Sequence, residues 1–204
     1  TTLDHLAIEL GRKAGEFADV VKSGRTHLQD AVPITLGQEF GGYAQIVRDH
    51  RRLITSAADE LRALGIGGSA AGSGLNTHPD YARLMSERLT EQLGTEVRPA
   101  ENLFAAMQSM GPVVAMSSAL RNLALDLAKM ANDLRLLSSG PMTGLFEIDL
   151  PAVQPGSSIM PGKVNPVLPE MLNMVSFQVV GNATVVDYAS QAGQLELNVM
   201  MPVI

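Results

Sequence analysis

The chain has 204 residues, of which 46% are apolar, 18% are charged and 4% are aromatic, and its formal net charge is −6. This balance is typical of a packed globular protein, and it disfavours nucleic acid as a partner because phosphate binding needs a basic face. The absence of cysteine excludes disulfides and thiolate metal sites, and it favours a cytoplasmic location.

The first half of the chain is predicted to be helical with polar interruptions. Apolar periodicity predicts a helix from Leu3 to Lys22, closed by Gly24. The segment that follows, SGRTHLQDAVP, is predicted to be a loop. A second helix is predicted from about Leu36 to Leu64, and the glycine-rich turn GIGGSAAGSG ends it.

A shorter helix is predicted from about Pro79 to Leu93, with Asn76 or Thr77 available as its N-cap. The clearest pattern runs from Val113 to Leu137, where leucine and methionine recur at spacings of three and four. Such a seam is typical of a long helix packed against near-parallel neighbours.

A last helix is predicted beyond Pro166, with Pro169 tolerated in its first turn. No segment has the sustained alternation that indicates a sheet. The predicted fold is therefore all-α, a bundle of long helices.

The two ends of the chain read as cut. Thr1 stands where a complete protein would begin with Met, and the final LELNVMMPVI stops on an apolar run without a polar cap. We therefore expect a piece of a longer protein.

Two motifs resemble nucleotide-binding sequences but lack their context. In GSSIMPGKV the glycines are one residue too far apart for a P-loop, and Val164 follows Lys163 where Ser or Thr would bind magnesium. Gly65, Gly67 and Ala70 fit a dinucleotide pattern, but a predicted helix precedes them instead of a strand. A turn between helices is favoured there, and a role in lining a site stays open.

Neither a cofactor nor a metal is predicted. The four histidines lack any metal-ligand spacing. No apolar run is long enough to span a membrane.

The loop GRTHLQDAVP presents Arg25, Thr26, His27 and Gln29 between helices. Polar groups of three chemistries ending at a proline can be aimed at a ligand. Taken alone, a plain connecting loop capped by Asp30 is an equally good interpretation.

The segment PGSSIMPGKVNP, from Pro155 to Pro166, holds three prolines and so cannot continue a helix. It offers the hydroxyl of Ser157, the point cation of Lys163 and the amide of Asn165. Flanking glycines allow it to close over a substrate as a lid. Together the two loops fit recognition of a carboxylate, and a serine or histidine in them can transfer a proton.

GSSIMPGKVNP closely resembles the signature loop of the aspartase/fumarase superfamily of lyases. GRTHLQDAVPITLGQEF, GSGLNTHPDYAR, ANDLRLLSSGP and AGQLELNV resemble other segments of that family in its usual order, so the resemblance covers essentially the whole chain. It implies that residues 1–204 are a central helical-bundle domain, truncated at both ends and lacking the N-terminal and C-terminal domains. A fragment without those parts is expected to have little or no activity on its own.

The resemblance also implies the reaction and the assembly. Family members reversibly eliminate a leaving group from a succinyl C–C bond to give fumarate, without cofactor or metal. Their sites are shared between three subunits of a homotetramer joined through the central helices. The implied partners are thus a small dicarboxylate substrate and further copies of the chain, with neither nucleic acid nor membrane.

Site roles follow from the motif positions. The first serine of the signature, Ser157, is the implied proton-abstracting base, and Lys163 and Asn165 are implied to bind substrate carboxylate. A serine is a poor base at its ordinary pKa, so backbone donors must hold its oxyanion.

Thr26 and His27 match the family's other substrate-contacting pair, and Glu170 matches the acidic residue that partners that histidine. An ion pair between His27 and Glu170 would favour the charged form of the histidine.

Within the family, GRTHLQDAVP, VNPVLPE, AGQLELN and PAENLFAAM resemble the aspartate ammonia-lyases more than the fumarases. LNTHP leans toward fumarase. Met142 and Met201 depart from the Arg and the Glu that those positions usually carry. The predicted reaction is elimination of ammonia from L-aspartate to give fumarate. Fumarate hydration to L-malate on the same residues, or a non-catalytic helical scaffold, remain the alternatives.

Overall fold

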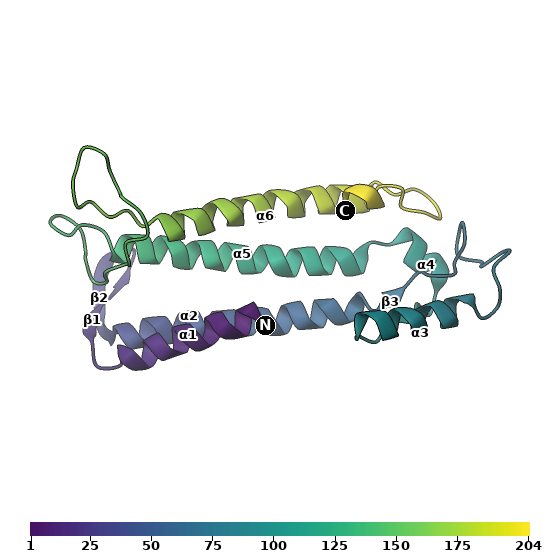
Figure 1. Cartoon of the computed structure of the whole chain (residues 1–204), viewed down its shortest axis with the longest axis horizontal. Coiled ribbons are helices and arrows are strands. Elements are labelled where there is room, and N and C mark those ends of the chain that lie inside the picture. The colour runs from purple at the N-terminus through teal and green to yellow at the C-terminus, as the bar shows by residue number, and fades with distance from the viewer. The chain divides into compact units, whose positions relative to one another are not determined.

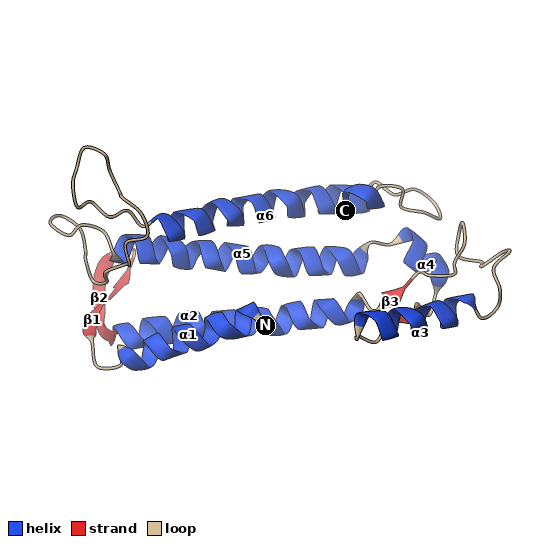
Figure 2. Ribbon diagram, viewed as in Figure 1, coloured by secondary structure: helices blue, strands red, loops and turns tan.

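The computed structural model describes all residues from 1 to 204, and most of them lie in helices (Figures 1 and 2). The helices are α1 (Thr2–Glu16), α2 (Leu36–Glu60), α3 (Tyr81–Leu93), α4 (Leu103–Gln108), α5 (Gly111–Leu137) and α6 (Val167–Gln191), followed by the 3₁₀ turn η1 (Met201–Val203). The predicted all-α bundle class is confirmed. No helix has both the length and the apolar character needed to cross a membrane.

The chain divides into two compact units. The first comprises Thr1–Leu53 and Asn122–Ser176, and the second comprises Ile54–Arg121 and Phe177–Ile204. Both loops that the sequence singles out lie in the first unit.

The core of the first unit lies where α1, the start of α2 and the end of α5 pack together. Phe40 meets Phe17 edge to face with ring centroids 5.4 Å apart, and it meets Tyr43 in the same way at 5.7 Å. Such aromatic pairs add stability beyond the area they bury. The buried members of the cluster are Ala7, Leu36, Phe40, Tyr43, Val47 and Met130.

The prediction of a loop after the first helix is wrong, because this segment forms a β-hairpin. Helix α1 ends at Glu16 rather than Lys22, and β1 (Val21–Thr26) pairs antiparallel with β2 (Gln29–Thr35). Gly24 therefore lies within a strand and does not cap a helix. Most of β2 is exposed on both faces, so no alternation of apolar and polar residues marks it in the sequence.

Smaller differences occur at helix ends. Helix α2 ends at Glu60, because β3 (Ala63–Leu64) pairs in parallel with β4 (Arg98–Pro99). Asp80 takes the N-cap position of α3 in place of Asn76 or Thr77, and α4 was not predicted. Helices α5 and α6 begin within two residues of their predicted starts, so the long seam and the start beyond Pro166 are confirmed.

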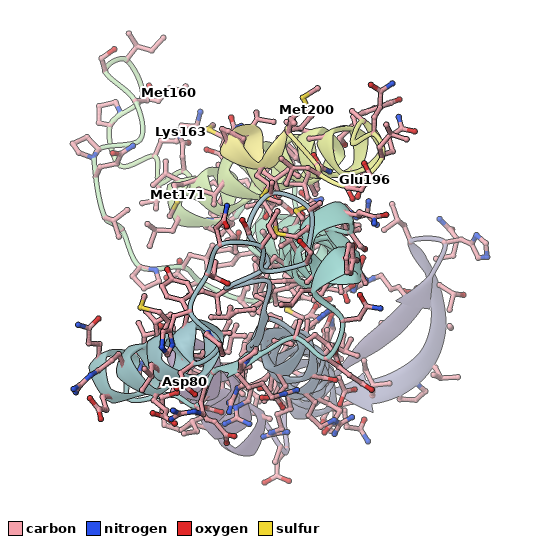
Figure 3. The ribbon with its side chains drawn as sticks, turned by 90° about the vertical axis from the view of Figure 1, so that its right-hand side faces the viewer. Asp80, Met160, Lys163, Met171, Glu196 and Met200 are labelled. Carbon is pink, nitrogen blue, oxygen red and sulfur yellow. The ribbon has the colours of Figure 1, made fainter.

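In the second unit the buried side-chain amide of Asn198 caps the C-terminal end of α6. The Asn198 side chain donates to the carbonyl oxygens of Ala189 and Ser190 at 3.2 and 3.0 Å, while its backbone N–H donates to the Met107 carbonyl at 3.1 Å. Helix C-termini leave carbonyls without intrahelical partners, and Asn198 supplies donors to two of them. The labelled Glu196 and Met200 mark the segment that carries Asn198 in Figure 3.

Candidate active site

The signature loop is closed on itself by one backbone hydrogen bond and one side-chain hydrogen bond. The Gly156 N–H donates to the Lys163 carbonyl at 3.1 Å, and the Asn165 amide donates to the Gly156 carbonyl at 2.7 Å. Met160 and Lys163 mark this loop in Figure 3, where it projects beyond the start of α6 that carries Met171. The loop is thus exposed and yet has a defined shape.

Ser157 lies half-buried inside the closed loop. Its Oγ accepts hydrogen bonds from the backbone N–H groups of Ile159 and Met160, both at 3.2 Å. Hydroxyl–backbone contacts of this kind are common in turns. Two donors aimed at one oxygen also favour the negatively charged form of that oxygen.

Lys163 and Asn165 lie together in a cavity of about 480 Å³ between the signature loop and the segment after α5. The Lys163 ammonium is exposed and makes no ion pair or hydrogen bond within the chain, whereas Asn165 is held by Gly156. A second cavity, of about 440 Å³, is lined by both Lys163 and Ser157. A free cation beside an amide and a hydroxyl is suited to an anionic ligand.

Thr26 and His27 lie at the exposed tip of the β1–β2 hairpin. His27 and Leu28 form its two-residue turn with φ values of 55° and 62°. Positive φ at both central positions is usual for such turns, but Asn and Gly are the residues that favour it. Strained backbone of this kind is concentrated at functional sites, which favours a role for the tip.

The structure does not bring all the predicted residues together within one chain. Glu170, in the first turn of α6, forms an ion pair with Arg135 at 3.7 Å, and His27 makes neither a hydrogen bond nor an ion pair. Thr26 lines a cavity of about 460 Å³ that includes neither Ser157 nor Lys163. The pairing of His27 with Glu170 stays a prediction.

Sequence reasoning missed a charge network beneath the hairpin. The Lys22 ammonium, whose side chain is only 8% exposed, contacts Glu39 at 2.5 Å and Glu147 at 2.9 Å. Glu147 also accepts from Arg25 at 2.6 Å, and the Tyr43 hydroxyl lies 3.1 Å from Glu39. Arg25 and Glu147 are 122 residues apart, so no local signal in the sequence links them.

The network shifts the pKa of its members. The hydrogen bond from Arg25, together with that from Lys22, lowers the pKa of Glu147. Burial alone would lower the pKa of Lys22, but the hydrogen bonds to Glu39 and Glu147 outweigh burial and raise it. Both groups are therefore held in their charged forms.

No group of His, Cys, Asp and Glu side chains is arranged to hold a metal ion. The arrangement can hold an anion, move a proton at Ser157 and stabilise negative charge with backbone donors.

The protein is thus a helical bundle whose candidate site residues lie mostly on loops between rigid helices. The chain matches the model of the lyase family over residues 1–181, and it belongs to that family. The family anticipated from the signature loop is thus confirmed.

Relatives of known sequence include aspartate ammonia-lyases. The chain is 53% identical to an aspartate ammonia-lyase of Helicobacter pylori over 95% of its length, and 51% identical to one from Pseudomonas fluorescens over 100%. These matches cover 41% and 43% of the respective relatives, so the chain spans less than half of their length.

Solved structures agree on the fold. A protein described as fumarate lyase:delta crystallin from Brucella melitensis superposes with a TM-score of 0.94 at 49% identity, covering 98% of this chain and 44% of that one. A class II fumarase from Schistosoma mansoni superposes with a TM-score of 0.95 at 40% identity, covering 98% and 45%.

Proposed function

We propose that the protein containing this chain is a carbon–nitrogen lyase that eliminates ammonia from L-aspartate to give fumarate, with Ser157 as the base. The sequence identities of 53% and 51% to two aspartate ammonia-lyases support the reaction class. The proposed location is the cytoplasm, which suits a chain without cysteine.

The observation that carries the proposal is the environment of Ser157. In the elimination, a base removes the proton from the carbon next to one carboxylate, and the electron pair then expels ammonia from the neighbouring carbon. The two N–H groups at 3.2 Å from Oγ stabilise the alkoxide that must form before Ser157 can accept a proton. Stabilisation by preorganised donors of this kind is usually the largest contribution to such catalysis.

Lys163 and Asn165 would bind a substrate carboxylate. The ammonium of Lys163 is unpaired in the chain and lines both cavities of the loop. As the substrate loses its proton, negative charge builds up on its carboxylate, and a cation nearby lowers the energy of that state.

The remaining contacts would come from other copies in a homotetramer. On α6, four apolar side chains of the first unit are half or more exposed: Leu168, Met171, Met174 and Val175. A run of exposed apolar residues along one helix marks an interaction surface. Packing of these faces would bring the Thr26–His27 tip of one copy toward the Glu170 and Ser157 of others, which gives shared sites.

Fumarate hydration is the second candidate. The likeness to the Schistosoma mansoni class II fumarase supports it, because hydration and deamination need the same base and the same carboxylate contacts. A non-catalytic scaffold is disfavoured by the exposed, shaped loop, since a structural plug would be packed against its surroundings.

The test is to purify the complete gene product that carries this sequence and to follow fumarate formation from L-aspartate and from L-malate in parallel. We expect turnover of L-aspartate only. Turnover of L-malate alone would move the protein to the fumarase reaction on the same site. Turnover of neither would overturn the proposal in both forms.

A further inference from the structure

We propose that Glu147 is a positioning residue: its carboxylate fixes the hairpin tip to the segment that follows α5. The inference rests on the function proposed above, because the tip carries the substrate contacts Thr26 and His27. The proposal gives a role to the charge network of Lys22, Arg25, Glu39 and Glu147, which takes no part in proton abstraction or in binding the substrate carboxylate.

Both oxygens of the Glu147 carboxylate are used, and both bind the same strand. Oε2 lies 2.9 Å from the Lys22 ammonium, and Oε1 accepts from Arg25 Nη2 at 2.6 Å. The bond from Arg25 is charge-assisted and so belongs to the strong class of hydrogen bond, whereas the contact with Lys22 is an ion pair. A carboxylate held at two points constrains the direction of β1 and not only its distance.

We call the contacts of Glu147 with Lys22 and Arg25 the clamp. The backbone that carries Glu147 is also held in place. The Glu147 backbone N–H donates to the Leu137 carbonyl at 2.8 Å, and the Phe146 N–H donates to the Ser139 carbonyl at 2.9 Å. Phe146 is held at φ 45°, a conformation that a bulky residue keeps only where its surroundings enforce it. The carboxylate is therefore presented from a rigid turn anchored on the end of α5.

The hairpin shows a matching irregularity. In a regular strand, successive side chains point to opposite faces, so Lys22 and Arg25 would point apart. The ladder is disturbed between Gly24 and Arg25, and a bulge there bends and twists the strand locally. Both side chains reach Glu147, and the next residue along β1 is Thr26.

The clamp joins the two parts of the chain that hold the predicted site residues. Phe146, Asp149 and Leu150, on either side of Glu147, line the cavity with Lys163 and Asn165. Glu39, on the first turn of α2, also belongs to the network, because its carboxylate lies 2.5 Å from the Lys22 ammonium. The position of the hairpin tip is thereby tied to the wall of the carboxylate-binding cavity.

The test compares Glu147→Gln with Glu91→Gln in the complete gene product. Gln keeps the shape of Glu but cannot bind two cations as an anion. Glu91 pairs with Arg88 on the exposed surface of α3 and gives a matched loss of charge. The measured quantities are kcat and KM for the substrate and the rate of amide hydrogen exchange in the hairpin.

We expect Glu147→Gln to lower kcat/KM by about 10- to 100-fold, as small misplacements of binding groups do, and to speed exchange at the hairpin tip, while Glu91→Gln changes neither. Equal kcat/KM and equal exchange in the two variants would overturn the proposal. Should Glu147→Gln fail to fold, Arg25→Gln releases one arm of the clamp and leaves the pairing with Lys22.

A double variant separates positioning from charge balance. If Glu147 serves only to neutralise Lys22, then Lys22→Met combined with Glu147→Gln restores kcat/KM, and the positioning role is overturned. If Glu147 positions the tip, kcat/KM stays low because Arg25 remains untethered. A parent protein that turns over no dicarboxylate would defeat the proposed function alone, and hydrogen exchange would then decide the clamp.

Discussion

The side-chain amide of Asn165 donates a 2.7 Å hydrogen bond to the carbonyl oxygen of Gly156, nine residues earlier in the chain. With the Gly156 N–H bonded to the Lys163 carbonyl at 3.1 Å, this contact closes the signature loop at its base. Closure sets the position of Ser157, which directly follows Gly156, and of Lys163 on the opposite side.

Gly156→Ala is expected to abolish this closure without unfolding the protein. A Cβ at Gly156 would collide with the Lys163 carbonyl oxygen, a backbone atom that cannot rotate aside as a flexible side chain can. We expect kcat/KM to fall by about 10²-fold, with the unfolding midpoint nearly unchanged because the loop is exposed. Gly42→Ala is the control, since a Cβ there meets open space. Equal activity of the two variants would show that loop closure is dispensable.

Ser157→Ala tests the base. Removing a positioned proton acceptor is expected to lower kcat by about 10²–10⁴-fold, while KM changes little because the carboxylate contacts remain. Ser158→Ala is matched in chemistry and is one residue away, but Ser158 is exposed and makes no side-chain hydrogen bond. Steady-state kinetics of both variants decide the matter: a similar loss in each would assign the effect to the loop and not to the Ser157 hydroxyl.

Lys163→Met keeps the length of the side chain and removes its charge. Since a hydrogen bond to a charged group is worth about 1.5–3 kcal/mol, binding of a dicarboxylate is expected to weaken by about 10- to 150-fold. Calorimetric titration with succinate measures this without turnover. Lys129→Met is the control, because Lys129 already pairs with Asp133. Unchanged succinate affinity in Lys163→Met would remove Lys163 from the carboxylate site.

The long helices could be predicted because their apolar residues repeat with the period of a helix over many turns. The α5 seam and the start of α6 were found in this way to within two residues. The hairpin was not found, since a mostly exposed β2 carries no alternation and its pairing with β1 depends on contacts beyond the strand itself. Helix α4 spans only six residues, which is too short for a periodic signal.

The candidate site likewise contains residues that the sequence could indicate and residues that only the fold brings together. Ser157, Lys163 and Asn165 lie within nine residues of one another in a motif with three prolines, so their proximity could be predicted from the sequence, while their roles stay predictions. Glu147 could not be predicted, because its partners Lys22 and Arg25 are brought to it only by the fold. The predicted pairing of His27 with Glu170 is not formed within the chain, where Glu170 pairs with Arg135.

Met174→Glu tests assembly through α6. Met174 is 67% exposed and lies on the same apolar face as Met171, so a carboxylate there would be buried without a partner if the faces pack together. We expect the proposed homotetramer of the complete gene product to dissociate, with a cost of at least about 2 kcal/mol per interface. Ile8→Glu places the same charge on α1, at a residue that is 63% exposed. Sedimentation showing the same species for both variants would exclude this face from the interface.

The charge network predicts how stability depends on pH. The pKa of Glu147 is lowered from 4.5 by its bonds to Arg25 and Lys22, so its contribution is complete above 4.5 and is lost as pH falls through the folded-state value. The pKa of Lys22 is raised from 10.5, so its contribution is complete below 10.5 and is lost only as pH rises through its folded-state value. Near neutral pH both are present, and Glu147→Gln is expected to cost about 2 kcal/mol.

Urea unfolding of the wild type and of Glu147→Gln, from about pH 7 to about pH 3, measures this difference. The gap in the free energy of unfolding should shrink toward the acid end, because a protonated Glu147 and a glutamine are both neutral. Glu91→Gln, at an exposed ion pair, should differ from the wild type by less than about 1 kcal/mol throughout. A gap for Glu147→Gln that stays constant with pH would mean that the substitution acts through packing, and that the carboxylate charge does not hold the hairpin to the segment after α5.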